Sequence, residues 1–170
     1  MSDNEKRFTL DDVVASTLEA EKARYHFTGC MYKVLLEELG KDRANDLMHK
    51  AYFAYGHTKH PTAPIVPGDP EGFCKTYARG EHSYFPYSMD MPYKVDDDGA
   101  VMQWCTDGCC IGLAWFADVG LNPEQVRELC WDCAVAGDIG YADKCGLDAY
   151  FTKTCATGAD CCEIVLKKRK

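Results

Sequence analysis

The stretch AYFTKTCATGADCCEIVL, residues 149–166, predicts the last β-hairpin of this chain. Two apolar runs are joined across the turn sequence TGAD at 157–160. Side chains alternate along a strand, so Cys162 shares its face with Ile164 and Leu166. We therefore expect Cys162 to point into the core or into a pocket within it.

The elements before this hairpin follow from turn and capping signals. The Asp-Gly end of the turn DDDG at 96–99 predicts a hairpin, and Asn122 with Pro123 and Gln125 is typical of a helix start. The expected elements are strands at 93–95 and 101–105, a helix from Asp107 or Gly108 to Gly120, and a helix from Asn122 to Gly137.

The N-terminal third has helical periodicity. Thr9 and Asp12 resemble a capping pair, and apolar residues then recur at helical spacing. We expect helix over Leu10–Gly56, with a break at 27–29, a C-cap at Gly40 and a second helix from Asp42 to Tyr55 closed by Gly56. Six of the seven prolines lie within 57–92, which predicts an irregular excursion with one short strand near Phe73–Ala78.

These elements predict an α+β fold, with N-terminal helices packed on a small antiparallel sheet of hairpins. The length suits one domain over 1–170, comprising a helical part (1–56), the proline-rich excursion (57–92) and a cysteine-rich part (93–170).

The net charge of −8 disfavours a nucleic-acid partner or an anionic membrane. The charged N-terminus does not resemble a signal peptide, and no apolar run approaches the ~20 residues that span a bilayer. We therefore expect a cytoplasmic protein with reduced thiols. The expected partners are a small-molecule substrate or ligand and, in a homodimer, a second copy of the chain.

Eleven residues are cysteine, and nine of these lie between Cys105 and Cys162. Cys105 ends a predicted strand, where pocket residues tend to lie. Cys109 and Cys110 would occupy the first turn of the next helix, where unpaired N–H groups lower a thiol pKa. That position suits a nucleophile or a metal ligand equally, although free cysteines also behave as small buried apolar residues.

Cys130 and Cys133 are three residues apart and would share one helix face. CxxC is typical of zinc and redox sites, but packing beside Trp131 explains it as well. A divalent metal such as zinc would need four ligands, which Cys105, Cys130, Cys133 and Cys162 would supply if the fold brings them together.

Several carboxylates are interleaved with these thiols. Asp132 lies in mid-helix, where aspartate has poor propensity, and is the candidate general base or proton shuttle. Asp160 lies in a turn, where aspartate commonly bonds its own backbone. The histidines all lie between His26 and His82, and we interpret His57, His60 and His82 as exposed loop residues rather than as ligands.

Together these segments resemble the L-2-amino-thiazoline-4-carboxylic acid hydrolase family from about Thr28 to the C-terminus. The segments that carry the resemblance are GCMY (29–32), EELGKDRA (37–44), the Cys105 segment, AWF (114–116) before Gly120, Leu129-Cys130 with Asp132, and GADCCE (158–163). The closing segment is also similar to that of 4-vinyl reductase domains. The chain departs from the family pattern at Thr106, where we expect proline, and at Ile164, where we expect an aromatic residue.

The resemblance implies the α+β ligand-binding fold of nitric-oxide-sensing and Golgi-transport proteins. It also implies a hydrolase that opens a small thiazoline-carboxylate-like ring by adding water at the amidine-like carbon. The expected catalytic residues are Cys105, Asp132 and Cys130, with Cys105 as nucleophile or metal ligand. The expected substrate-binding residues are Cys162, Asp160, Trp104 and Asp107. Two alternatives stay open, a non-catalytic small-molecule sensor or carrier and a thiolate metal-binding protein.

Overall fold

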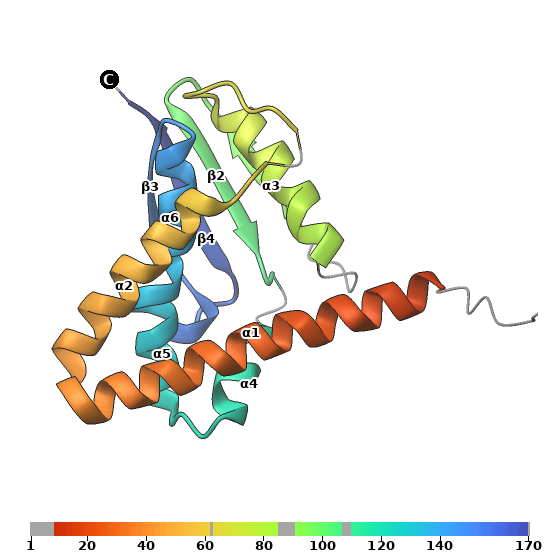
Figure 1. Ribbon diagram of the computed structural model, residues 1–170. Coiled ribbons are helices and arrows are strands. Elements are labelled where there is room, and N and C mark those ends of the chain that lie inside the picture. The colour runs from red at the N-terminus through yellow and green to blue at the C-terminus, as the bar shows by residue number, and fades with distance from the viewer. Residues whose placement is uncertain (1–8, 62, 85–90, 107–109, 170) are drawn as a thin grey trace, which may run out of the picture.

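The computed structural model describes residues 9–61, 63–84, 91–106 and 110–169, and within them it has the expected α+β class (Figure 1). The helices are α1 (Leu10–Leu39), α2 (Lys41–Thr58), α3 (Pro70–Tyr84), α4 (Ile111–Asp118), α5 (Pro123–Glu128) and α6 (Val135–Lys144), with a π-helical segment η1 (Leu129–Ala134) and a 3-10 turn η2 (Cys155–Thr157). The strands are β1 (Tyr93–Val95), β2 (Gly99–Trp104), β3 (Leu147–Lys153) and β4 (Cys162–Lys168).

The first helix begins at the predicted capping pair. Thr9 Oγ1 accepts from the Asp12 N–H at 3.2 Å, and the Asp12 carboxylate accepts from the Thr9 N–H at 2.8 Å. The predicted break at 27–29 is wrong, because α1 continues through it to Leu39. Gly40 ends the helix as predicted, with φ +74°.

Glycines bring α2 and α6 into close contact. A Cβ added at Gly56 would lie 2.2 Å from Gly137 O, and one added at Gly140 would lie 2.2 Å from Phe53 O. The predicted helix ends at Gly56 and Gly137 are therefore wrong. The helices continue to Thr58 and Lys144 because these glycines permit backbone contact between helices instead of terminating them.

The predicted strand near Phe73–Ala78 is wrong as well, because these residues belong to α3. Pro70 occupies the first position of the helix, where its missing N–H has no intrahelical partner to lose. Asp69 Oδ1 accepts from the Glu71 N–H at 3.1 Å. Proline therefore starts this helix, and the Phe73 side chain is buried on its inner face.

The helix after Cys105 starts later than predicted. The expected start at residues 107–108 lies outside the described residues, and α4 begins at Ile111 with Cys110 as its N-cap. It ends at Asp118, just before Gly120, whose φ is +81°. The capping box of Asn122 and Gln125 at the start of α5 is confirmed.

The sheet has the strand order β1-β2-β4-β3, and every neighbouring pair is antiparallel. In β4 the alternation predicted for Cys162, Ile164 and Leu166 is confirmed, since all three are buried. Trp104 at the end of β2 pairs with Cys162 at the start of β4.

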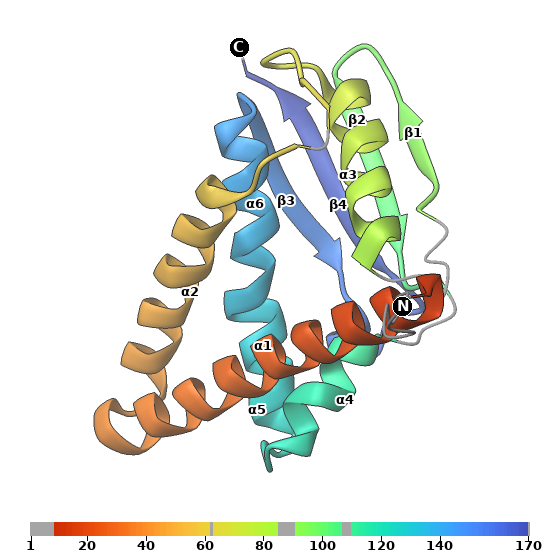
Figure 2. The same cartoon turned by 45° about the vertical axis from the view of Figure 1, so that its right-hand side comes forward.

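Helices cover one face of this sheet. Residues of α3 and α6 share the first core with the sheet, and α2 packs on α6. In Figures 1 and 2, α1 crosses the end of the sheet where β2 ends, with α4 and α5 on the same side. There a second core joins α1, α2, α4 and η1 around Tyr32, Met48 and Leu129. Among the described helices, none has the length and apolar character required to cross a bilayer.

Candidate metal centre

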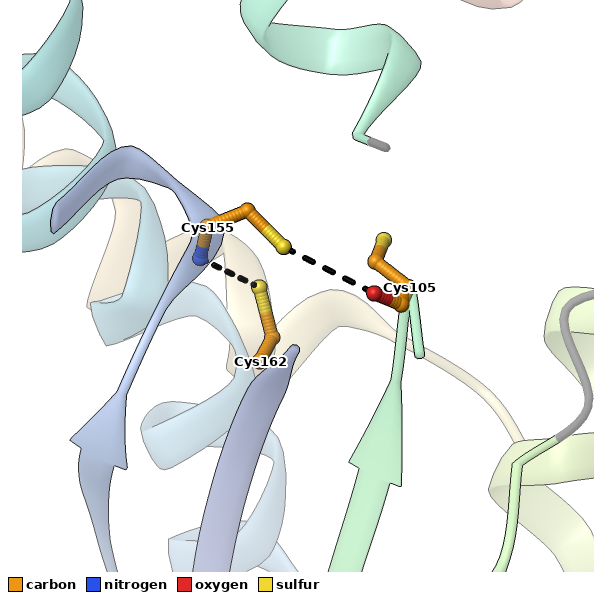
Figure 3. A group of neighbouring side chains, drawn as sticks. All are labelled: Cys105, Cys155 and Cys162. Atoms are coloured by element: carbon orange, nitrogen blue, oxygen red, sulfur yellow. Dashed lines mark hydrogen bonds between the residues drawn. The ribbon is translucent and has the colours of Figure 1, made fainter. Parts of the chain in front are cut away.

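Three cysteine thiols meet at one end of the sheet. Because neighbouring strands are antiparallel, β2 and β3 end where β4 begins. Cys105 follows β2, Cys155 follows β3, and Cys162 opens β4. Their Sγ atoms all lie within 4.8 Å of one another. Strand topology thus converges three residues from separate segments on one point, as Figure 3 shows.

Cys105 has an unusual backbone conformation. Its φ is +53°, and among the described residues it is the one non-glycine residue with positive φ. A non-glycine residue in this region carries about 1–2 kcal/mol of strain, and such strain clusters at functional sites. The conformation turns the chain sharply after β2, and the Cys105 thiol is buried next to the other two.

Cys155 links the other two members of the group. Its backbone N–H donates to Cys162 Sγ at 3.5 Å, and its own thiol donates to Cys105 O at 3.8 Å (Figure 3). The register of β3 against β4 shifts between Phe151 and Lys153. This irregularity lies between the regular part of β3 and Cys155, which begins the turn η2.

Cys110 lies beside this group at the N-terminus of α4. The Cys105 side chain lowers the pKa of Cys110 to about 7, with help from the backbone N–H groups of Gly112 and Leu113. Burial opposes the shift but does not cancel it. The thiolate of Cys110 therefore forms close to neutral pH.

The remaining thiols of the site differ in their protonation. Contact with Cys105 lowers the pKa of Cys162, whereas the same contacts with Cys110 and Cys162, together with burial, raise the pKa of Cys105. Burial raises the pKa of Cys155 to about 12. Burial also raises the pKa of Cys130, and the nearby charges of Cys110, Cys162 and Cys155 raise it further. We call the three-thiol group, together with the two cysteines that interact with it electrostatically, the five-thiol site. Its members are Cys105, Cys110, Cys130, Cys155 and Cys162.

The distances within this site suit a thiophilic metal ion. Zinc binds thiolates at ~2.3 Å, so a tetrahedral zinc ion holds its sulfur ligands ~3.8 Å apart. Sulfurs within 4.8 Å of one another need only small rotamer adjustments to reach that spacing. Three cysteines would supply three ligands, and Cys110 is the nearest candidate for a fourth.

The structure separates Cys133 from the predicted metal ligands. Its thiol lies 3.7 Å from Asn45 O and is fully buried in the second core, where burial raises its pKa to about 12. The expectation that Cys130 and Cys133 share a helix face assumed a regular α-helix, but both lie in the π-helical segment η1. Both thiols act on Tyr52, but Cys133 also bonds Asn45 O in the second core, and the three-thiol group contains Cys155 and not Cys133.

Neither expected carboxylate lies with the thiols. Asp132 is exposed, and its charge acts on Tyr32 and Cys133 of the second core. Asp160 is in the turn before β4, where it forms an ion pair with Lys153 at 2.9 Å that lowers its pKa. This fits the turn role that the sequence favoured.

A different carboxylate, Asp138 of α6, acts on the site. Its charge contributes to the raised pKa of Cys130. It accepts hydrogen bonds from Lys59 Nζ at 2.9 Å and from Tyr77 OH at 2.7 Å. Asp138 was one of the interleaved carboxylates, but nothing in its spacing distinguished it from Asp132.

The other predicted residues occupy varied positions. Trp104 lies on the inner face of the sheet next to Cys162, stacks on Tyr77 and meets Phe151 edge-on. Asp107 lies outside the described residues. Of the histidines whose side chains the structure describes, none is in the three-thiol group. His57 and His60 are exposed as expected, but His57 lies in α2 rather than in a loop and pairs with Asp143 at 2.9 Å.

Comparisons of the chain with protein-family models, with curated proteins and with solved structures find no match. The resemblance to the thiazoline-carboxylate hydrolase family consequently remains a hypothesis, and the site must be interpreted from its own geometry.

Proposed function

We propose that this protein binds one thiophilic divalent cation of the zinc class through Cys105, Cys155 and Cys162. The observation that carries the proposal is the mutual approach of three sulfur atoms, within 4.8 Å, from three separate strand ends. Thiolates are the ligands that soft and borderline metals prefer, and a cage of carboxylates suited to calcium or magnesium is not present among the described residues at this point.

Cys110 is the fourth ligand in this proposal. It lies beside Cys105 and holds a thiolate more readily than its neighbours, so it would enter the coordination sphere without a large cost for losing its proton. Cys130 is close enough to be influenced by the same charges, and its raised pKa would keep it a protonated thiol outside the ligand set. A divalent cation would offset two of the four negative charges that four buried thiolate ligands create.

Because the site is buried, the protonation of its thiols depends on whether an ion is bound. Without a cation, burial keeps Cys155 and Cys130 protonated. A bound ion replaces thiol protons, so the affinity should rise with pH and binding should release protons.

The test is metal analysis on protein purified without oxygen and without an affinity tag that binds metal. We expect close to one zinc-class ion per chain and protection of Cys105, Cys155 and Cys162 from alkylation. Cys155→Ser should lower the stoichiometry, whereas Cys133→Ser, which alters a buried thiol outside the site, should keep it. Metal-free protein that takes up no added zinc would reject the proposal.

A second candidate is the hydrolysis that the family resemblance implies. The position of Cys110 before the first turn of α4 favours it, because free N–H groups there stabilise a thiolate. That thiolate would attack the amidine-like ring carbon, water would displace it from the adduct, and cleavage of the ring C–S bond would give an N-carbamoyl cysteine. Overall, one water is consumed and the Cys110 thiolate is regenerated.

The two candidates can be distinguished with the same variants. Hydrolysis predicts turnover of 2-amino-thiazoline-4-carboxylate that is lost in Cys110→Ser. Metal binding predicts an ion whether or not any substrate is turned over. An inactive protein that holds one ion would support the metal-binding proposal alone.

A further inference from the structure

The outer face of α1 carries a stripe of small and apolar side chains with a seven-residue repeat. Its members are Val13, Ser16, Ala20, Ala23, Phe27, Cys30 and Val34, and all seven are exposed. Steps of three and four residues are the a and d spacing of a coiled-coil seam, and no charged residue interrupts it. A helix that only covers a core would normally place charged side chains on this face.

The stripe lies opposite the face by which α1 joins the rest of the chain. Tyr25 and Tyr32 point inward, to α4 and to the second core. Phe27 and Val34 are 68% and 56% exposed, which is high for large apolar residues. In Figure 2, α1 crosses in front of α4 and α5, and none of the drawn elements lies on its outer side.

We propose that two copies of this chain associate through α1, with the two helices antiparallel along the stripe from Val13 to Val34. In this register the small Ala20 meets the partner's Ala23 near the two-fold axis. The large Phe27 then meets the partner's Ser16, so bulky and small side chains alternate across the seam.

Charge along one edge of the stripe supports this orientation. Asp12, Glu19, His26 and Lys33 are also seven residues apart, and the edge changes from acidic to basic along the helix. An antiparallel partner brings Asp12 next to the partner's Lys33, and Glu19 next to the partner's His26. Lys33 and His26 are held beside the seam by contacts with Val119 O and Asp118 of their own chain.

A parallel pair would be less well matched. It would place Glu19 near the partner's Arg24 and Lys33 near the partner's Glu38, but Asp12 and His26 would lie opposite the uncharged Thr17 and Met31. Phe27 would also face its own copy, leaving no small residue to receive it.

The fold also reduces the conformational entropy that α1 would lose on dimerisation. An isolated helix of this length must order its backbone in order to dimerise, whereas α1 is already held by α2 and α4. In the antiparallel register the two stripes overlap from Val13 to Cys30, a length of about 25 Å. This surface is independent of the thiol site, so the two proposals can fail separately.

The first test is the mass of the intact protein by light scattering and sedimentation across the micromolar range, under reducing conditions. We expect twice the chain mass of 19.0 kDa. Phe27→Lys places a charge in the seam and should weaken the dimer by roughly 100-fold or more. Val66→Lys is the matched control, since Val66 is equally exposed but lies far from the stripe in the sequence, and it should remain dimeric. A monomer at every concentration, or equal loss in both variants, would overturn the proposal.

The second test fixes the orientation by mild oxidation. The antiparallel register keeps the two Cys30 residues about 25 Å apart along the axis, so wild-type protein should form no cross-link that Cys30→Ser removes. The double variant Ala20→Cys, Ala23→Cys should form a covalent dimer, because these positions face each other. A cross-link through Cys30 would instead establish a parallel pair and overturn the antiparallel arrangement.

Discussion

The five-thiol site and the isolated cysteines Cys74, Cys133 and Cys145 consist of the same residue in very different settings. Burial does not distinguish them, since Cys133 is fully buried and Cys162 is 5% exposed. What distinguishes them is whether several strand ends meet beside the thiol. Cys74, Cys133 and Cys145 lie within or directly after a single helical segment and fill gaps between apolar side chains, whereas Cys105, Cys155 and Cys162 come from three strand ends that meet at one end of the sheet. Convergence of element ends, rather than cysteine density, therefore defines a candidate site.

The largest expected effect is on zinc binding, and it should separate substitutions at two adjacent cysteines. Cys162→Ser removes a proposed ligand and should abolish stoichiometric zinc binding in a titration. Cys161→Ser changes the next residue, which is also buried but outside the three-thiol group, and should bind normally. Equal behaviour of the two variants would show that the geometric distinction between them has no chemical meaning.

Mutations in the second core should change the stability of the protein without changing zinc binding. Met48 is buried there, so Met48→Ala should lower the free energy of unfolding by about 2–5 kcal/mol in urea denaturation. The exposed Val66→Ala should change it by less than ~0.5 kcal/mol. Both folded variants should bind zinc with wild-type stoichiometry. Loss of the ion from folded Met48→Ala protein would mean that the two regions are not separable.

Thiol reactivity should differ with pH between the two groups. In metal-free protein the alkylation rate of Cys110 should rise with a midpoint near its pKa of about 7, while Cys133, with a pKa of about 12, stays unreactive. Peptide mass spectrometry after timed labelling measures both. A Cys110 midpoint at the ordinary thiol pKa would contradict the assigned environment.

The lowered pKa of Cys110 also makes the free energy of unfolding of metal-free protein depend on pH. The folded-state pKa of Cys110 is lower than the unfolded one, so folded protein binds fewer protons between these values. The stabilisation is complete above the unfolded pKa and is lost as the pH falls through about 7. Cys110→Ser should flatten this part of the stability profile.

The smallest effect concerns the carboxylates. Asp138→Asn removes a charge that raises the pKa of Cys130, so Cys130 alkylation at fixed pH should become a few-fold faster. Asp132→Asn, at an exposed position outside the thiol site, should leave the rate unchanged. A stronger response to Asp132→Asn would restore the role that the sequence suggested for it.

Local signals predicted much of the fold correctly. The hairpin turns, the capping boxes at Thr9 and Asn122 and the inward face of Cys162 depend on residues close in sequence. The helix α3 was missed because proline was interpreted as a helix breaker, although at the first helical position it is compatible with a helix.

The composition of the site was only partly predictable. Cys105 and Cys162 were expected and belong to the three-thiol group, whereas Cys130 lies outside that group and is influenced by the charges of Cys162 and Cys155. Cys155 was missed because its proximity to Cys105 and Cys162 depends on which strand ends meet in the folded sheet, and the sequence does not give that pairing. Cys133 was misplaced because a π-helical turn has no reliable sequence signal. Both errors concern features that tertiary structure determines.

The most direct test of the central claim is an anaerobic titration with Co²⁺, whose thiolate complexes have charge-transfer absorption, on wild type, Cys155→Ser and Cys133→Ser. Proposed ligation by Cys105, Cys155 and Cys162 predicts one Co²⁺ per chain with thiolate charge transfer. That signal should be lost or strongly weakened in Cys155→Ser and unchanged in Cys133→Ser. No charge-transfer signal in wild type, or a signal that depends on Cys133 instead of Cys155, would contradict it.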